Sequence, residues 1–107
     1  MKEIKFSQVS PMGKIEGILR IIGKDLFFKY NNNQYAEQAM KQMENKGAII
    51  IRKREWIKVN LFNNQENVIM GGKEFNVNET LIEDIEMILF NFYMEQFKKA
   101  GCEVKEG

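Results

Sequence analysis

The stretch NETLIEDIEMILFNFYMEQFKKAG, residues 78–101, is the longest helical pattern in the chain and its densest apolar segment. Asn78 is a suitable N-cap for a helix that begins near residue 79, and a capping box formed by Thr80 and Glu83 offers an alternative start. Acidic residues gather towards its beginning, and two lysines precede a glycine at its end, as the helix dipole and a left-handed C-terminal cap favour. We therefore predict one long helix here.

This helix would carry two apolar faces. At about 100° per residue, the face that we assign to the core holds Leu81, Ile82, Ile85, Ile88, Leu89 and Phe92. A second arc, mostly opposite, holds Met87, Phe90, Tyr93, Met94 and Phe97. One sheet cannot cover both faces, and five large side chains left in water would approach the largest apolar patch that a monomer tolerates. We predict that the second arc contacts another protein, either a copy of this chain in a homodimer or a different target; the alternative is that loops or the first helix of the same chain cover it.

The N-terminal third predicts antiparallel strands. Residues 2–9 alternate as a short strand. Residues 14–22 and 25–30 flank Gly23 and Lys24, and a glycine at the first loop position is what a type II′ two-residue turn requires. That turn predicts a register with Ile21 opposite Leu26, Leu19 opposite Phe28, and Gly17 opposite Tyr30.

A shorter helix is predicted over residues 34–46, with Asn33 as its N-cap and Gly47 as its stop. Residues 68–70 and 74–77 resemble a last hairpin about two glycines. Strands that pair with their sequence neighbours, with two helices inserted, predict a single α+β domain spanning the whole chain. Its sheet is largely antiparallel, the helices pack on one face, and the longer helix is the C-terminal one.

The segment from residue 48 to residue 62 has two interpretations. Residues 48–51 and 57–62 are strands in both. In a hairpin, the polar residues 52–55 form the tip, and this is favoured because four consecutive polar residues separate two apolar runs. In one continuous strand, a single face would carry Arg52, Arg54, Trp56 and Lys58.

Composition limits the classes of function. The chain has 107 residues, with 16 basic and 15 acidic side chains, so net charge does not favour nucleic acid or a membrane. A single cysteine excludes a disulfide within the chain, and no stretch approaches the roughly 18 apolar residues of a membrane span. We expect a soluble cytoplasmic protein that does not bind membranes.

Few residues are available for catalysis. The chain has no histidine, which removes histidine-based triads and the common zinc sites. Glu83 and Glu86 could hold a hard cation, but acidic residues that stabilise a helix N-terminus are the simpler interpretation. Cys102 follows a glycine and has two lysines nearby that could lower its pKa, yet without a histidine partner a peripheral thiol is the simpler interpretation. We therefore predict no catalytic residue, metal ion or cofactor.

One basic and aromatic group is a candidate for contact with nucleic acid or a nucleotide. It comprises Arg52, Lys53, Arg54, Trp56 and Lys58, with Arg20 and Lys29 joining if the two hairpins lie together. Cations neutralise phosphates and tryptophan offers a stacking face, as in proteins that bind single strands. The alternative is a solvated hairpin tip that protects a sheet edge.

Two functions follow from these patterns. The first is a non-enzymatic protein-interaction module, of the inhibitor or adaptor type, that self-associates or binds a target protein through the second arc of the long helix. The second is a protein that binds single-stranded nucleic acid or a nucleotide ligand through the basic and aromatic hairpin.

Overall fold

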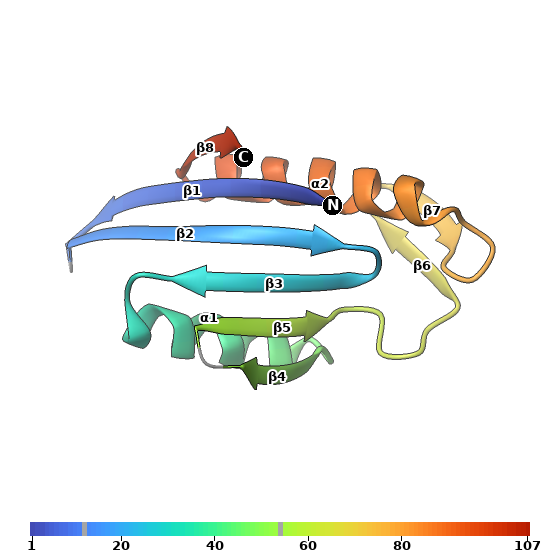
Figure 1. Cartoon of the computed structure of the whole chain (residues 1–107), viewed down its shortest axis with the longest axis horizontal. Coiled ribbons are helices and arrows are strands. Elements are labelled where there is room, and N and C mark those ends of the chain that lie inside the picture. The colour runs from blue at the N-terminus through green and yellow to red at the C-terminus, as the bar shows by residue number, and fades with distance from the viewer. Residues whose placement is uncertain (12, 54) are drawn as a thin grey trace.

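The computed structural model describes residues 1–11, 13–53 and 55–107. Its strands are β1 (Lys2–Ser10), β2 (Gly13–Ile22), β3 (Asp25–Tyr30), β4 (Ile49–Lys53), β5 (Trp56–Asn60), β6 (Asn67–Met70), β7 (Lys73–Asn76) and β8 (Glu103–Glu106), and its helices are α1 (Asn33–Asn45) and α2 (Ile82–Lys99). Within the described part, six strands form one antiparallel sheet in the order β4-β5-β3-β2-β1-β8, and β6 and β7 form a separate ribbon (Figure 1). The predicted α+β class, with the longer helix near the C-terminus, is confirmed.

The predicted hairpins form through their glycine turns. In the β2–β3 hairpin, Ile21 pairs with Leu26, Leu19 with Phe28, and Gly17 with Tyr30, as predicted. Gly23 has φ +59°, while Lys24 is not among the residues with positive φ, which is the pattern of a type II′ turn. The segment with two interpretations is a hairpin: β4 and β5 pair antiparallel, with Lys53 opposite Trp56.

Both helices lie on one face of the six-stranded sheet, behind it in Figure 1. Phe28 and Tyr30 point to this face from β3, where Phe28 meets Tyr93 of α2 and Tyr30 meets Tyr35 of α1. The fully buried side chains between the sheet and α2 are aliphatic and aromatic residues of both layers: Ile4, Leu19, Ile21, Leu26, Phe28, Val59, Ile85 and Leu89. A single one-sided core therefore holds the domain together.

Two helix starts differ from prediction. The N-cap of α1 is Asn32, whose side chain accepts the Tyr35 N–H at 3.1 Å, so the prediction of Asn33 was one residue late. α2 begins at Ile82 rather than near 79, and neither Asn78 nor Thr80 caps it. Hydrogen bonds made by Asn76 account for the later start of α2.

The Asn76 side chain accepts the N–H groups of Asn78 and Glu79 at 2.9 and 3.0 Å, and its carbonyl accepts the Thr80 hydroxyl at 2.6 Å. These bonds hold residues 76–80 in a turn, because a short polar side chain can compete with the helix for backbone donors. The helix consequently starts two residues after Thr80.

α2 ends as predicted at Gly101, which has φ +86°. The Gly101 N–H donates to the Lys98 carbonyl at 3.0 Å and the Cys102 N–H donates to the Phe97 carbonyl at 2.9 Å, which together form a Schellman motif. The motif turns the chain back into β8, which pairs antiparallel with β1. This last strand was not predicted.

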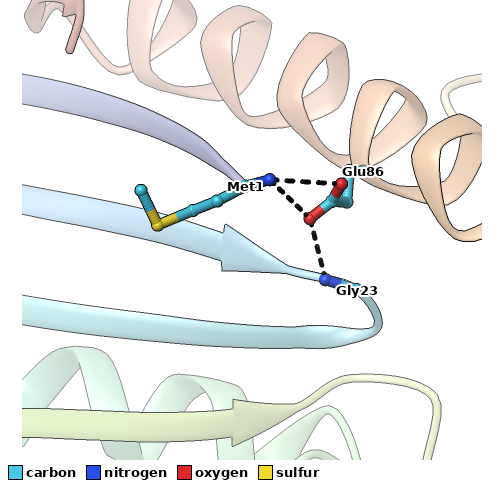
Figure 2. A network of polar contacts seen from close by, with 3 residues as sticks. All are labelled: Met1, Gly23 and Glu86. Atoms are coloured by element: carbon cyan, nitrogen blue, oxygen red, sulfur yellow. Dashed lines mark hydrogen bonds and ion pairs between the residues drawn. The ribbon is translucent and has the colours of Figure 1, made fainter.

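Glu86 is the charged residue that the described structure buries. Its carboxylate accepts the Gly23 N–H at 3.0 Å and lies 3.2 Å from the Met1 ammonium (Figure 2). Burial alone would raise the pKa of Glu86, but the Gly23 hydrogen bond, the Met1 ammonium and nearby Lys2 outweigh burial and hold the pKa below its usual value. Glu86 thus ties α2 to the β2–β3 turn and to the start of β1.

Replacing Glu86 by glutamine keeps an oxygen for the Gly23 N–H but removes the charge. We expect Glu86→Gln to lower the free energy of unfolding near neutral pH by about 1.5–2 kcal/mol, in the lower part of the range for hydrogen bonds to charged groups. Because the folded-state pKa is lowered, the wild-type advantage is complete above the unfolded pKa of about 4.3 and is lost as pH falls through the folded pKa.

Urea unfolding of both proteins, with Met1 unblocked and across a range of acidic pH, measures this difference. Glu95→Gln, an exposed carboxylate of the same helix beyond its first turn, is the control, and it should change the free energy of unfolding by less than about 0.5 kcal/mol, since its ion pair with Lys99 lies at the surface. If the free energy of unfolding of the wild type still exceeded that of Glu86→Gln at the lowest pH, the result would contradict the charge interaction.

Candidate functional site

The second arc of α2 is packed mostly inside the chain. Phe90 is buried, with 9% of its surface exposed, and Tyr93, Met94 and Phe97 pack against the core, whereas Met87 is 44% exposed. Within the single chain, therefore, all of these side chains except Met87 are covered wholly or in part by the chain itself, as the alternative interpretation expected. Their predicted contact with another protein stays a prediction.

The strands β1 and β8, rather than a loop or α1, cover these side chains of α2. α2 packs against β1 and β8, and the ring of Phe97 stacks on Phe6 of β1 with their centroids 4.2 Å apart. Gly17 leaves the space that the Phe6 ring fills, since a Cβ at Gly17 would lie 2.3 Å from that ring. By widening the sheet beyond β1, β8 lets a second side of the helix find apolar neighbours.

The predicted core face of α2 is correct in its middle and wrong at its start. Ile85 and Leu89 are fully buried, whereas Leu81 and Ile82 are 67% and 50% exposed. Leu81 precedes the helix, and Glu86, one turn after Ile82, occupies a buried position. The buried side of the helix is therefore rotated towards Phe90 and away from Leu81.

A groove of about 490 Å³ accompanies the exposed side of α2, between this helix and the β6–β7 ribbon. Its apolar lining comes from Met70, Phe75, Met87, Ile88 and Phe92. Met87 is thus the member of the predicted arc that still faces an accessible surface.

The second candidate group is brought together on the other face of the sheet. β3 pairs with both β2 and β5, so the two hairpins lie together, and strand alternation puts Arg20, Lys29, Trp56 and Lys58 on the face opposite the helices. We call this face, which carries these four residues together with Glu3, Ile18, Ile22, Phe27, Ile49 and Ile51, the open face.

Arg52 does not belong to the open face. It alternates to the helix side of β4, where its guanidinium donates to both carboxylate oxygens of Glu37 in α1, at 2.6 and 2.8 Å. These hydrogen bonds lower the pKa of Glu37. Of Lys53 the structure describes the backbone, which pairs with Trp56, and Arg54 lies outside the described residues.

Three cations of the open face, those nearest to Trp56 and Phe27, are already engaged. Arg20 pairs with Glu3 at 2.6 Å, Lys29 with Glu55 at 3.1 Å, and Lys58 with Asp25 at 3.6 Å. The Arg20 guanidinium also lies 4.6 Å from the centre of the Trp56 ring, and Lys29 lies 5.8 Å from it. The face is therefore a set of neutralised ion pairs laid over aromatic rings.

Apolar side chains make up the rest of the open face. Ile22, Ile49 and Ile51 are 47%, 45% and 47% exposed, and Ile18, Phe27 and Trp56 are half-buried. The alternation of β2 and β3 contained a signal for part of this set, since one side of that hairpin mixes charged with apolar residues. The exposure of Ile49 and Ile51 on this face could not be predicted in the same way, because the sequence does not show which strand lies at the edge of the sheet.

The open face also has a hollow of about 740 Å³ where β3, β2, β1 and β8 run side by side. Lys5 and Lys105 lie directly opposite each other across β1 and β8 at its border. Neither has an acidic side chain within ion-pair distance among the residues that the structure describes. Like charges opposite each other are unfavourable, and Glu16 and Glu103, which line the same hollow, offset part of the positive charge.

Groups with chemical reactivity are few. Burial raises the pKa of the Cys102 thiol, contrary to the lowering that the nearby lysines suggested, and its Sγ lies 3.8 Å from Gln8 Oε1. Within the described residues, histidine, cysteine and acidic side chains do not form a group of three able to hold a metal ion. No helix in that part of the chain is long and apolar enough to cross a membrane.

Comparison with protein-family models, curated proteins and solved structures found no match.

The packing of α2 can be tested by paired truncations. We expect Phe97→Ala to lower the free energy of unfolding by about 2–4 kcal/mol, because it removes a ring stacked on Phe6, whereas Met87→Ala should cost less than about 1 kcal/mol. Chemical denaturation of both variants measures the difference. Equal, small effects would mean that Phe97 is not part of the core.

Proposed function

We propose that this chain is a protein-interaction module that binds a target protein through the open face of its six-stranded sheet. The observation that carries this proposal is the composition of that face. Trp56 and Phe27 lie among exposed isoleucines, and the nearest cations, Arg20, Lys29 and Lys58, are paired with carboxylates. Tryptophan and arginine surrounded by apolar side chains are typical of the residues that dominate protein–protein binding energy.

The ion pairs favour a protein over a nucleic acid. Binding of single strands depends on cations that are free to neutralise phosphates and on an aromatic ring that is free to stack. On the open face, Arg20 and Lys29 both have acidic partners and both lie near the Trp56 ring. A nucleic acid would have to displace these contacts, whereas an apolar protein surface can pack over them.

The chemistry of the partner follows from the same residues. Its contact surface should be apolar where it meets Trp56 and Ile22, with a carboxylate placed to reach Lys5 and Lys105. Such a carboxylate would relieve the repulsion between two lysines that lie opposite each other. An inhibitor or adaptor role fits this mode of binding, in which the open face provides the contacts that the sequence suggested for the second arc of α2.

Truncation of Trp56 tests the open face against the helix. We expect affinity purification from a lysate of the native host to recover a protein with the wild type and with Met87→Ala, but not with Trp56→Ala. For that protein, once purified, calorimetry should show a loss of affinity of about tenfold or more with Trp56→Ala, as for a central contact residue. Thermal unfolding of each variant verifies that it is folded.

Two results would contradict the proposal. Loss of the same protein with Met87→Ala but not with Trp56→Ala would assign binding to α2. A saturable change in Trp56 fluorescence with single-stranded oligonucleotides or nucleotides, weakening as salt is added, would assign the open face to nucleic acid instead. We expect no such change, even at low salt.

A further inference from the structure

The two edges of the six-stranded sheet are protected differently. β8, at one edge, has four residues, and three of them are charged. β4, at the other edge, begins with three consecutive isoleucines, Ile49 to Ile51, and carries charge only at its end, in Arg52 and Lys53. No described strand pairs with its outer side (Figure 1). Natural sheets usually protect an edge with charges, proline, a bulge or a covering segment. The isoleucine run of β4 lacks these features.

We propose that β4 pairs with β4 of a second copy of this chain, antiparallel and about a two-fold axis, so that two six-stranded sheets join into one. Alternate residues of a strand direct their backbone N–H and C=O groups to opposite sides. β5 therefore satisfies only half of the groups in β4, and a second strand can accept the others. This surface and this partner differ from those of the proposed function, and the inference does not depend on the proposed function.

The residues of β4 suit pairing with themselves. With the two-fold axis at Ile51, the two copies of Ile51 lie opposite each other, and Ile50 lies opposite Arg52 of the copy. Apolar pairs across antiparallel strands are favourable, and this register keeps the two arginines apart. Ile51 stays on the open face, while Ile50 stays on the helix side, where it already packs against the core.

Charge complementarity supports the same arrangement. Glu37 and Glu44 are two turns apart on α1, about 10 Å, and Glu37 already holds Arg52 at the β4 edge. α1 runs antiparallel to β4, so Glu44 is level with the beginning of the strand, about 10 Å back from Arg52. In the pair of chains, Arg52 of the copy lies opposite Ile50, about 7 Å back from Arg52 and therefore between the levels of Glu37 and Glu44. Each Arg52 can then interact with its own Glu37 and with Glu44 of the other chain.

The small size of the contact sets its strength. Five residues of strand extend about 17 Å, and the joined edges bury less surface than the 1,200–2,000 Å² or so of a stable specific interface. We therefore expect a weak dimer whose population rises with concentration.

Two equally exposed isoleucines provide a matched test, because Ile51 and Ile22 are each 47% exposed on the open face and only Ile51 lies on the edge strand. Ile51→Glu introduces a charge across from Lys58, and Ile22→Lys one across from Asp25, so each variant gains an oppositely charged neighbour within its own sheet. We expect sedimentation velocity to show a concentration-dependent dimer for the wild type and Ile22→Lys, and its loss in Ile51→Glu. Hydrogen exchange should show increased protection of β4 as the wild type is concentrated.

Other outcomes would overturn the inference. A wild type that remains monomeric up to its limit of solubility excludes the paired edge. A dimer that persists in Ile51→Glu but is lost in Ile22→Lys would place self-association on the open face. Far-ultraviolet circular dichroism and thermal unfolding of both variants establish that a lost dimer does not reflect a lost fold.

Discussion

The pairing of β3 with β5 is the contact on which the rest of this structure depends. It places Leu26 opposite Val59 and Phe28 opposite Ile57, and it joins the N-terminal hairpin to the β4–β5 hairpin. The alternate residues of the same two strands form the two faces of the domain. One face supplies the core beneath the helices, and the other collects Phe27, Lys29, Trp56 and Lys58 from segments that are distant in sequence.

Local signals predicted the hairpins well and the helix starts poorly. Glycines in two-residue turns decide register through backbone geometry alone, so the pairing of Leu19 with Phe28 could be predicted from sequence. A helix start depends on which of several nearby polar side chains captures the free N–H groups. Asn76 does so before Asn78 or Thr80 can, and the spacing of residue types does not distinguish among these three.

The candidate surfaces were predicted in part because they depend on long-range pairing. Counting apolar residues correctly showed that α2 has two apolar sides, but it could not show that the sheet is wide enough to cover both. The strand responsible, with the sequence EVKE, lacks the apolar alternation that identifies a strand. Likewise, Arg20 lies beside Trp56 only because their two hairpins are neighbours in the sheet. Arg52 lies on the face opposite Trp56 because side chains alternate along the edge strand β4.

The position of β8 has a consequence for synthesis of the chain. Because β8 follows α2 and pairs with β1, these two strands can meet only after the whole segment from β1 to β8 has left the ribosome. Until then, Phe97 and Met94 lack part of their cover, and a nascent or prematurely stopped chain displays an aromatic surface that the finished domain conceals. A chain in which β8 has not yet paired therefore resembles the partly folded species that chaperones bind, because its apolar side chains are transiently exposed.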